Sequence, residues 1–169
     1  MTEPGAPPPL RVTRLCEAHI PAVADIERQC FSQPWSEQAL RLLLIDGQGV
    51  GYVALEADGR AVGYAGMFLA PDEGQIASVA AHPAFRRRGA GRAVLRALIA
   101  DAAARELERL VLEVRVSNRP ARTLYLSEGF VEAGLRRGFY THPREDAVVM
   151  LRRLREETGA GADGRERET

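Results

Sequence analysis

The sequence predicts a single α/β domain in which a mixed β-sheet of about seven strands is flanked by about four helices. Its 169 residues are enough for one domain with a well-buried core. The pair Asp58-Gly59 separates two strand-like segments and is typical of a β-hairpin, which indicates antiparallel pairing. Further along, segments 74–82, 91–107 and 109–116 follow as strand, helix and strand, an order that indicates a parallel pair with a crossover helix.

The first half of the chain predicts the order βααβββ. Pro21 suits the first turn of one helix. Ser36 can cap the next helix, and Leu40, Leu43 and Leu44 of that helix are expected to face inward. The expected elements are strands at 10–15, 49–57, 61–70 and 74–82 and helices at 20–31 and 35–44.

The second half begins with the longest expected helix. Its residues Leu95, Leu98, Ile99 and Ala102 share one face, which predicts that this face packs on the sheet. Gly129 is suited to end a shorter helix. The expected elements are helices at 91–107 and 118–129 and strands at 109–116, 130–137 and 146–154. The complete predicted order is βααβββαβαββ.

Both ends of the chain are low in apolar residues. The Pro- and Gly-rich residues 1–9 and the polar residues 156–169 predict disordered tails around one domain at 10–155. The sequence has no signal-peptide pattern and no apolar run long enough for a membrane span, so a cytoplasmic protein without membrane contact is expected. Cys16 and Cys30 are expected to be reduced, buried thiols, and no metal site is expected.

One short loop is strongly basic although the whole chain is neutral. Lysine plus arginine and aspartate plus glutamate number 23 each, so no overall charge attracts nucleic acid. The loop residues are Arg86, Arg87, Arg88, Gly89, Gly91 and Arg92, at the start of the expected long helix. Free backbone N–H groups and the positive end of the helix dipole bind anions, and glycines let a pyrophosphate approach the backbone. The alternative is a solvated basic turn that caps the helix.

The loop does not have the spacing of a dinucleotide or P-loop motif, because position 94 is Val and no Gly-Lys-Ser/Thr follows. Its spacing R-x-x-G-x-G resembles the coenzyme A loop of the GNAT superfamily of N-acetyltransferases. Segments 31–37, 112–130 and 144–150 are similar to the RimI branch, whose members acetylate the N-terminal amine of a ribosomal small-subunit protein. The resemblance covers nearly all of 10–155 and implies the GNAT fold, a twisted mixed sheet flanked by helices.

The resemblance implies acetyl-CoA as the cosubstrate and a protein N-terminus, such as that of a ribosomal protein, as the acceptor. The residues implied to bind the cofactor are Val79, Ala80 and Ala81 for the pantetheine arm, Arg87, Arg88, Gly89, Ala90, Gly91 and Arg92 for the pyrophosphate, and Asn118. Glu113 corresponds to the family's proton acceptor and Tyr125 to its proton donor. Trp35 and the segment around Tyr140 correspond to regions that border the acceptor peptide.

The two implied catalytic residues also make chemical sense in their own sequence context. Glu113 interrupts a strand that otherwise predicts a covered, apolar element, so it needs a partner or a function; the alternative is an ion pair with Arg115 at a solvated sheet edge. Tyr125 can protonate a departing thiolate if it bonds to the sulfur. The alternative to this catalytic role is that Tyr125 is structural, with a half-buried ring and an exposed hydroxyl. His82 directly precedes Pro83 and is expected to be structural.

The acceptor is less defined than the reaction. The loop 138–143 is shorter than in the best-known members and segment 35–51 diverges, so a lysine side chain or a small amine stays open as the acceptor. A CoA-binding module without turnover is the alternative from another class, and the presence of both Glu113 and Tyr125 argues against it. Direct nucleic-acid binding is disfavoured because few aromatic residues lie among the arginines.

Overall fold

The computed structural model of the protein describes residues 8–155, and its elements follow the predicted order βααβββαβαββ. The strands are β1 (Arg11–Arg14), β2 (Gly49–Leu55), β3 (Ala61–Leu69), β4 (Glu73–Ala81), β5 (Arg109–Arg115), β6 (Val131–Tyr140) and β7 (Glu145–Arg153). The helices are α1 (Ile20–Cys30), α2 (Glu37–Leu40), α3 (Ala90–Ala104) and α4 (Arg119–Ser127). Short 3-10 turns cover Glu17–His19, Arg41–Leu44 and Pro83–Phe85.

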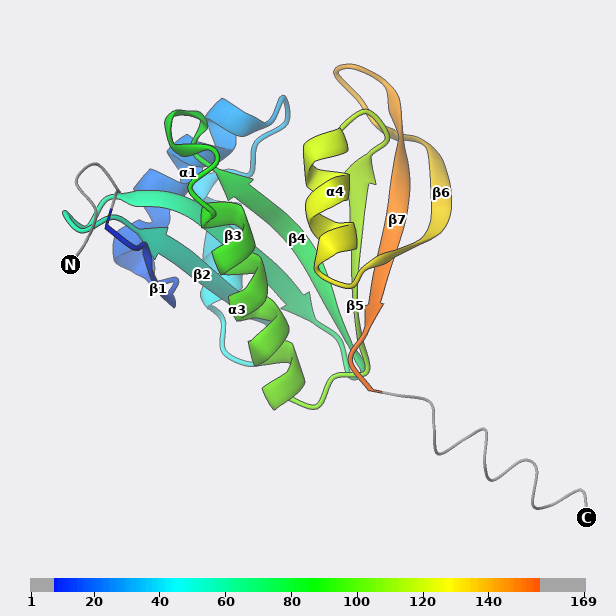
Figure 1. The fold of residues 1–169 in the computed structure, drawn as a ribbon, viewed down its shortest axis with the longest axis horizontal. Coiled ribbons are helices and arrows are strands. Elements are labelled where there is room, and N and C mark those ends of the chain that lie inside the picture. The colour runs from blue at the N-terminus through cyan, green and yellow to red at the C-terminus, as the bar shows by residue number, and fades with distance from the viewer. Residues whose placement is uncertain (1–7, 156–169) are drawn as a thin grey trace, which may run out of the picture.

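The strands form one mixed sheet in the order β1-β2-β3-β4-β5-β7-β6 (Figure 1). All neighbours are antiparallel except β4 and β5, which run parallel and are connected through α3. In the β2–β3 turn, Gly59 has a φ of 89° and Asp58 accepts a 2.9 Å hydrogen bond from the N–H of Arg60. The predicted hairpin and the predicted parallel pair are both confirmed.

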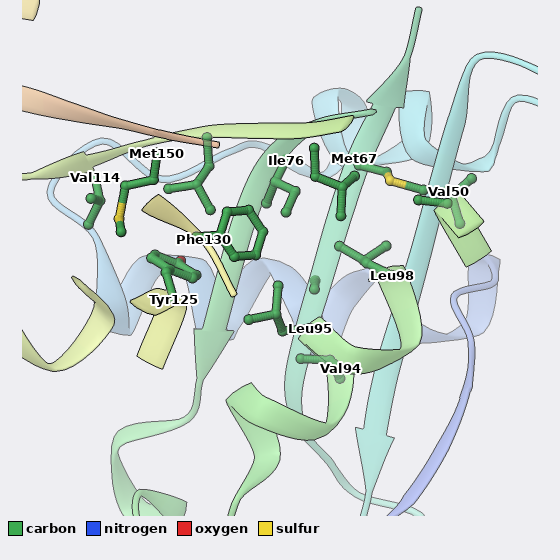
Figure 2. Packing of buried hydrophobic residues seen from close by; sticks show 14 of the residues in the cluster. Val50, Met67, Ile76, Val94, Leu95, Leu98, Val114, Tyr125, Phe130 and Met150 are labelled. Atoms are coloured by element: carbon green, nitrogen blue, oxygen red, sulfur yellow. The ribbon is translucent and has the colours of Figure 1, made fainter. Parts of the chain in front are cut away.

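Helices α3 and α4 cover one face of the sheet and share a core cluster with it (Figures 1 and 2). Val94, Leu95, Leu98 and Ala102 of α3 are fully buried, and Ile99 packs against the same cluster. The predicted inner face of this helix is therefore confirmed. At the end of α4, Gly129 has a φ of 91° and terminates the helix as expected.

Helices α1 and α2 cover the opposite face, where Ile20, Val23 and Ile26 of α1 are buried. The predicted single helix over 35–44 is wrong in its second half, because α2 ends at Leu40 and a 3-10 turn follows. This tighter turn lies directly on β2: a Cβ added at Gly49 would be 2.7 Å from the backbone of Leu42 and Leu43. Its close approach buries Leu40 and Leu43 as expected, while Leu44 is only partly buried.

The parallel strands separate after three residues. Glu73–Gln75 of β4 pair with Arg109–Val111 of β5, and beyond them β4 pairs only with β3 and β5 only with β7. A bulge at Ala77, which the pairing with β3 skips, adds to the bend of β4. The two strands are therefore joined at one end and open at the other (Figure 1).

The two predicted tails, 1–9 and 156–169, lie outside the described residues apart from Pro8 and Pro9. Both cysteines are free thiols, but the expectation that both are buried is wrong. Cys16 is exposed at the N-cap of the first 3-10 turn, where its N–H donates to the ring of His19, and Cys30 is half-buried. Within 8–155 no helix is long and apolar enough to cross a membrane, and no cluster of His, Cys, Asp or Glu is placed to hold a metal ion.

Candidate active site

The opening between β4 and β5 holds a cavity of about 380 Å³. Its walls come from α1 and the loop after it, from β4 and β5, from α4 and from the end of β6. Six of the predicted site residues line it: Trp35, Val79, Glu113, Asn118, Tyr125 and Tyr140. The splayed strands thus bring residues together that are far apart in the sequence.

Glu113 lies on the open face of β5. Along this strand Leu110, Leu112 and Val114 are buried, while Glu113 alternates with them and its side chain is 26% exposed. The expectation that both faces are covered holds for only one face, because the other borders the cavity. The predicted alternative, a pair between Glu113 and Arg115, is not formed: the carboxylate of Glu113 lies 3.7 Å from Arg136.

Tyr125 is the single buried residue of α4, at 6% exposure. Its ring lies 5.7 Å from that of Phe130, and the two are packed together near Met150 in Figure 2. Burial, followed by the nearby Tyr140, raises the pKa of Tyr125 well above its usual value. The alternative of a half-buried ring with an exposed hydroxyl does not fit this position, and a phenol with a raised pKa remains protonated at neutral pH.

Tyr140 forms another wall, at the end of β6. The guanidinium of Arg115 lies 4.4 Å from the centre of its ring, which is a cation–π contact. Burial, and then the charge of Glu113, raises the pKa of Tyr140 to about 12. Trp35 lies on the α1 side of the cavity, with its ring 5.9 Å from that of Phe68.

Glu27 is a polar residue of the site that the sequence analysis did not identify. Its carboxyl group is fully buried and accepts hydrogen bonds from the Trp35 N–H at 2.9 Å, the Tyr64 hydroxyl at 2.5 Å and the Ser78 hydroxyl at 2.7 Å. The available signal was its position: Glu27 shares the inner face of the helix with Ile20. A charged residue on such a face is rare unless it has partners.

The predicted phosphate loop leads into α3. Gly89 is the N-cap residue with a φ of 79°, and Arg87 has a φ of 68°, so two left-handed residues turn the chain into the helix. A Cβ added at Gly89 would meet no atom within 4 Å, so space outside this backbone is open to a ligand. Ala90 is buried against β3, where Gly63 has no side chain. A Cβ added at Gly63 would lie 3.0 Å from the Cβ of Ala90.

The arginine side chains of this loop are partly neutralised by carboxylates. Arg88 forms an ion pair with Glu56, while Arg92 lies 3.4 Å from Glu128 and donates a 3.1 Å hydrogen bond to Ser127. The first backbone N–H groups of α3 have no partner within the helix, and Arg86 and Arg87 of the loop are exposed, so both kinds of donor are available to an anion. This geometry fits a pyrophosphate.

The remaining residues named in the sequence analysis lie beside the cavity or cap neighbouring helices and turns. Ala80 is buried, and the carbonyl of Ala81 accepts a 3.2 Å hydrogen bond from the Cys30 thiol, so both shape β4 beside the cavity without lining it. Asn118 caps α4 by accepting a 3.2 Å hydrogen bond from Ala121 and also lines the cavity. His82 caps a 3-10 turn, in agreement with its expected structural role.

Comparison with known proteins defines the class. Residues 20–130 match the family model described as the acetyltransferase (GNAT) family. The chain belongs to this family, whose members take their acetyl group from acetyl-CoA.

Within the family the similarity is to RimI-type enzymes. The chain is 36% identical over 143 residues to the ribosomal protein bS18-alanine N-acetyltransferase of Escherichia coli K12, which covers 82% of this chain and 94% of that protein. It is 34% identical to the N-alpha-acetyltransferase RimI of Mycobacterium tuberculosis, over 85% of this chain and 92% of that protein. The crystal structure of the Escherichia coli enzyme matches with a TM-score of 0.79 at 32% identity, over 87% of this chain and 95% of that chain.

Proposed function

We propose that this acetyltransferase modifies the α-amine of an N-terminal alanine, with ribosomal protein bS18 as its acceptor. The names of its relatives support this acceptor. The observation that carries the proposal is the meeting of Glu113 and Tyr125 in one cavity, between strands that open toward the N-terminus of α3. Action on a ribosomal protein places the enzyme in the cytoplasm, and its net charge of zero gives no general attraction to nucleic acid.

In the proposed reaction the acceptor nitrogen attacks the acetyl carbonyl carbon, a C–N bond forms and the C–S bond of the thioester breaks. Glu113 takes the proton that leaves the amine. Tyr125 gives its hydroxyl proton to the sulfur as the C–S bond breaks. A proton then returns from Glu113 to Tyr125 through solvent, which restores both groups.

The chemistry of the amine favours an α-amine over a lysine. An α-amino group has a pKa of about 7.7–8.0 and a lysine a pKa of about 10.4. The difference of about 2.5 pKa units corresponds to about 3.4 kcal/mol of extra deprotonation cost for lysine. A cavity whose proton acceptor is a carboxylate is better matched to the amine that loses its proton more easily.

We propose that the cofactor lies along β4 and across the start of α3. The backbone of Val79, Ala80 and Ala81 would hold the pantetheine arm, the N–H groups of residues 87–92 the pyrophosphate, and the Asn118 amide a neighbouring polar group. When bound, acetyl-CoA supplies the activated acetyl group. Trp35 and Tyr140 would then flank the acceptor peptide at opposite walls of the cavity.

Three matched peptides test this proposal. One begins with a free alanine and contains lysine, the second has the same sequence with a blocked N-terminus, and the third is free but lacks lysine. We expect acetyl-CoA-dependent thiol release with the first and third peptides only. Release with the blocked peptide at a similar rate would assign the enzyme to lysine acetylation instead.

A further inference from the structure

Arg115 is a half-buried cation at the cavity, and the proposed proton transfers do not use it. It is the last residue of β5 and lies on the same face of the strand as Glu113. Its side chain is 22% exposed and lines the cavity. Because Glu113 does not pair with it, its contacts lie elsewhere.

Those contacts reach two loops on opposite sides of the cavity. In the β6–β7 loop, the Arg115 guanidinium donates to the carbonyl of Pro143 at 2.9 Å and to that of Thr141 at 3.1 Å. In the loop after α1, it donates to the hydroxyl of Ser32 at 3.4 Å. Its guanidinium carbon also lies over the ring of Tyr140, 4.4 Å from the ring centre. One side chain therefore joins the end of β5 to both loops that border the proposed acceptor.

A carboxylate holds this guanidinium in place. Glu145, at the start of β7, lies 3.3 Å from Arg115 and accepts a 2.6 Å hydrogen bond from the N–H of Ser117. Hydrogen bonds from Ser117 and then from Arg115 lower the pKa of Glu145, which keeps this carboxylate charged at neutral pH. The arginine is thus fixed from β7 while its remaining N–H groups hold the loop carbonyls.

We propose that Arg115 is a positioning residue that sets the spacing of the acceptor entrance by holding the β6–β7 loop against the loop after α1. This inference rests on the proposed transfer of acetyl to a peptide N-terminus. It assigns acceptor affinity to a residue that touches neither the reacting atoms nor the cofactor loop. Freeing the two loops costs binding of the peptide, while the proton-transfer groups on β5 and α4 remain in place.

The contacts need an arginine. A planar guanidinium can donate to several oxygens in its plane and stack on an aromatic ring at the same time, whereas an ammonium is a point charge. Lysine at position 115 keeps the attraction to Glu145 but loses the stack on Tyr140 and the simultaneous bonds to the Thr141 and Pro143 carbonyls. The geometric role therefore predicts a defect in Arg115→Lys as well as in Arg115→Ala.

The test compares steady-state kinetics of Arg115→Ala and Arg115→Lys with those of a matched control, Arg109→Ala. Arg109 lies on the same face of β5 at its other end, where it pairs with Glu73 and does not line the cavity. Acceptor KM, kcat and the Kd of acetyl-CoA are measured for each variant, with circular dichroism to confirm folding.

We expect Arg115→Ala to raise the acceptor KM about tenfold, with kcat and the Kd of acetyl-CoA within about twofold of wild type. Arg115→Lys should show an intermediate KM and Arg109→Ala a wild-type KM. A wild-type acceptor KM in Arg115→Ala, or full rescue by lysine, would overturn the inference. If the wild-type enzyme instead acetylates only lysine or a small amine, the proposed function fails, and the same KM comparison with that acceptor still decides the role of Arg115.

Discussion

Replacing Glu27 by leucine tests whether its buried carboxyl group holds the loop after α1. Leucine has a similar volume but cannot accept a hydrogen bond. Three donors lose their partner: the Trp35 N–H, the Tyr64 hydroxyl and the Ser78 hydroxyl. The two hydroxyls bond the same carboxyl oxygen and so lie near enough to rotate toward each other, whereas the backbone N–H of Trp35 cannot rotate.

The expected cost follows from this difference. A partly buried donor such as the Trp35 N–H costs about 1–3 kcal/mol when it loses its partner, and one lost hydroxyl bond adds about 1 kcal/mol. We therefore expect Glu27→Leu to lower the free energy of unfolding by about 2–4 kcal/mol. Glu27→Gln keeps an acceptor for Trp35 and should cost only about 1 kcal/mol, because its amide can donate to the two hydroxyls.

Urea denaturation followed by circular dichroism measures these changes. Gln29→Leu on the same helix is the control, because Gln29 makes only an exposed bond to Asp25 and should change stability by less than about 0.5 kcal/mol. A Glu27→Leu variant as stable as this control would contradict the prediction, since the carboxyl group would then contribute no net stabilisation.

Three further predictions concern the cofactor loop, the proton transfers and the acid stability. Gly89→Val forces a β-branched residue to a φ of 79° and fills the open space outside the loop. The Kd of acetyl-CoA, measured by calorimetry, should therefore rise at least about tenfold. An unchanged Kd in a folded variant would exclude the loop as the pyrophosphate site. Glu113→Gln and Tyr125→Phe should each lower kcat by about 10²-fold with little change in the Kd of acetyl-CoA, and near-wild-type kcat in both would make these residues structural. Because the pKa of Glu145 is lowered in the folded protein, its stabilising contribution is complete above the ordinary glutamate pKa of about 4.3 and is lost as pH falls through the folded-state pKa. Glu145→Gln should therefore reduce the fall of Tm at acid pH. An unchanged dependence of Tm on acid pH would contradict this role.

Local signals in the sequence predict most of the fold. The Asp58-Gly59 turn and the inner face of α3 depend on residues close together in the chain, so turn chemistry and helical spacing are enough to find them. The insertion of β7 between β5 and β6 has no such signal, because it depends on pairing between distant segments. The early end of α2 also depends on a distant residue, Gly49, which lets the following turn approach β2 closely.

In the candidate site, too, residues with a local sequence signal could be predicted and those that depend on distant contacts could not. Glu113 stands out in the sequence because a charged residue interrupts an apolar strand, and Tyr125 is found through the family resemblance. Glu27 carried a readable signal, a carboxylate on an apolar helix face, but its three donors come from separate elements. The role of Arg115 could not be predicted, since it depends on backbone carbonyls of a loop, and any residue type supplies a carbonyl.

The position of the transferred acetyl group tests the proposed function most directly. Ribosomal protein bS18 with a free N-terminal alanine is incubated with acetyl-CoA and either the wild-type enzyme or the Glu113→Gln variant, and the product is sequenced by tandem mass spectrometry. We expect one acetyl group, on the α-amine of the first residue, formed at least about 10²-fold more slowly by the variant. Acetyl groups mainly on lysine side chains, or no acetylation of this protein by an enzyme that binds acetyl-CoA, would contradict the proposal.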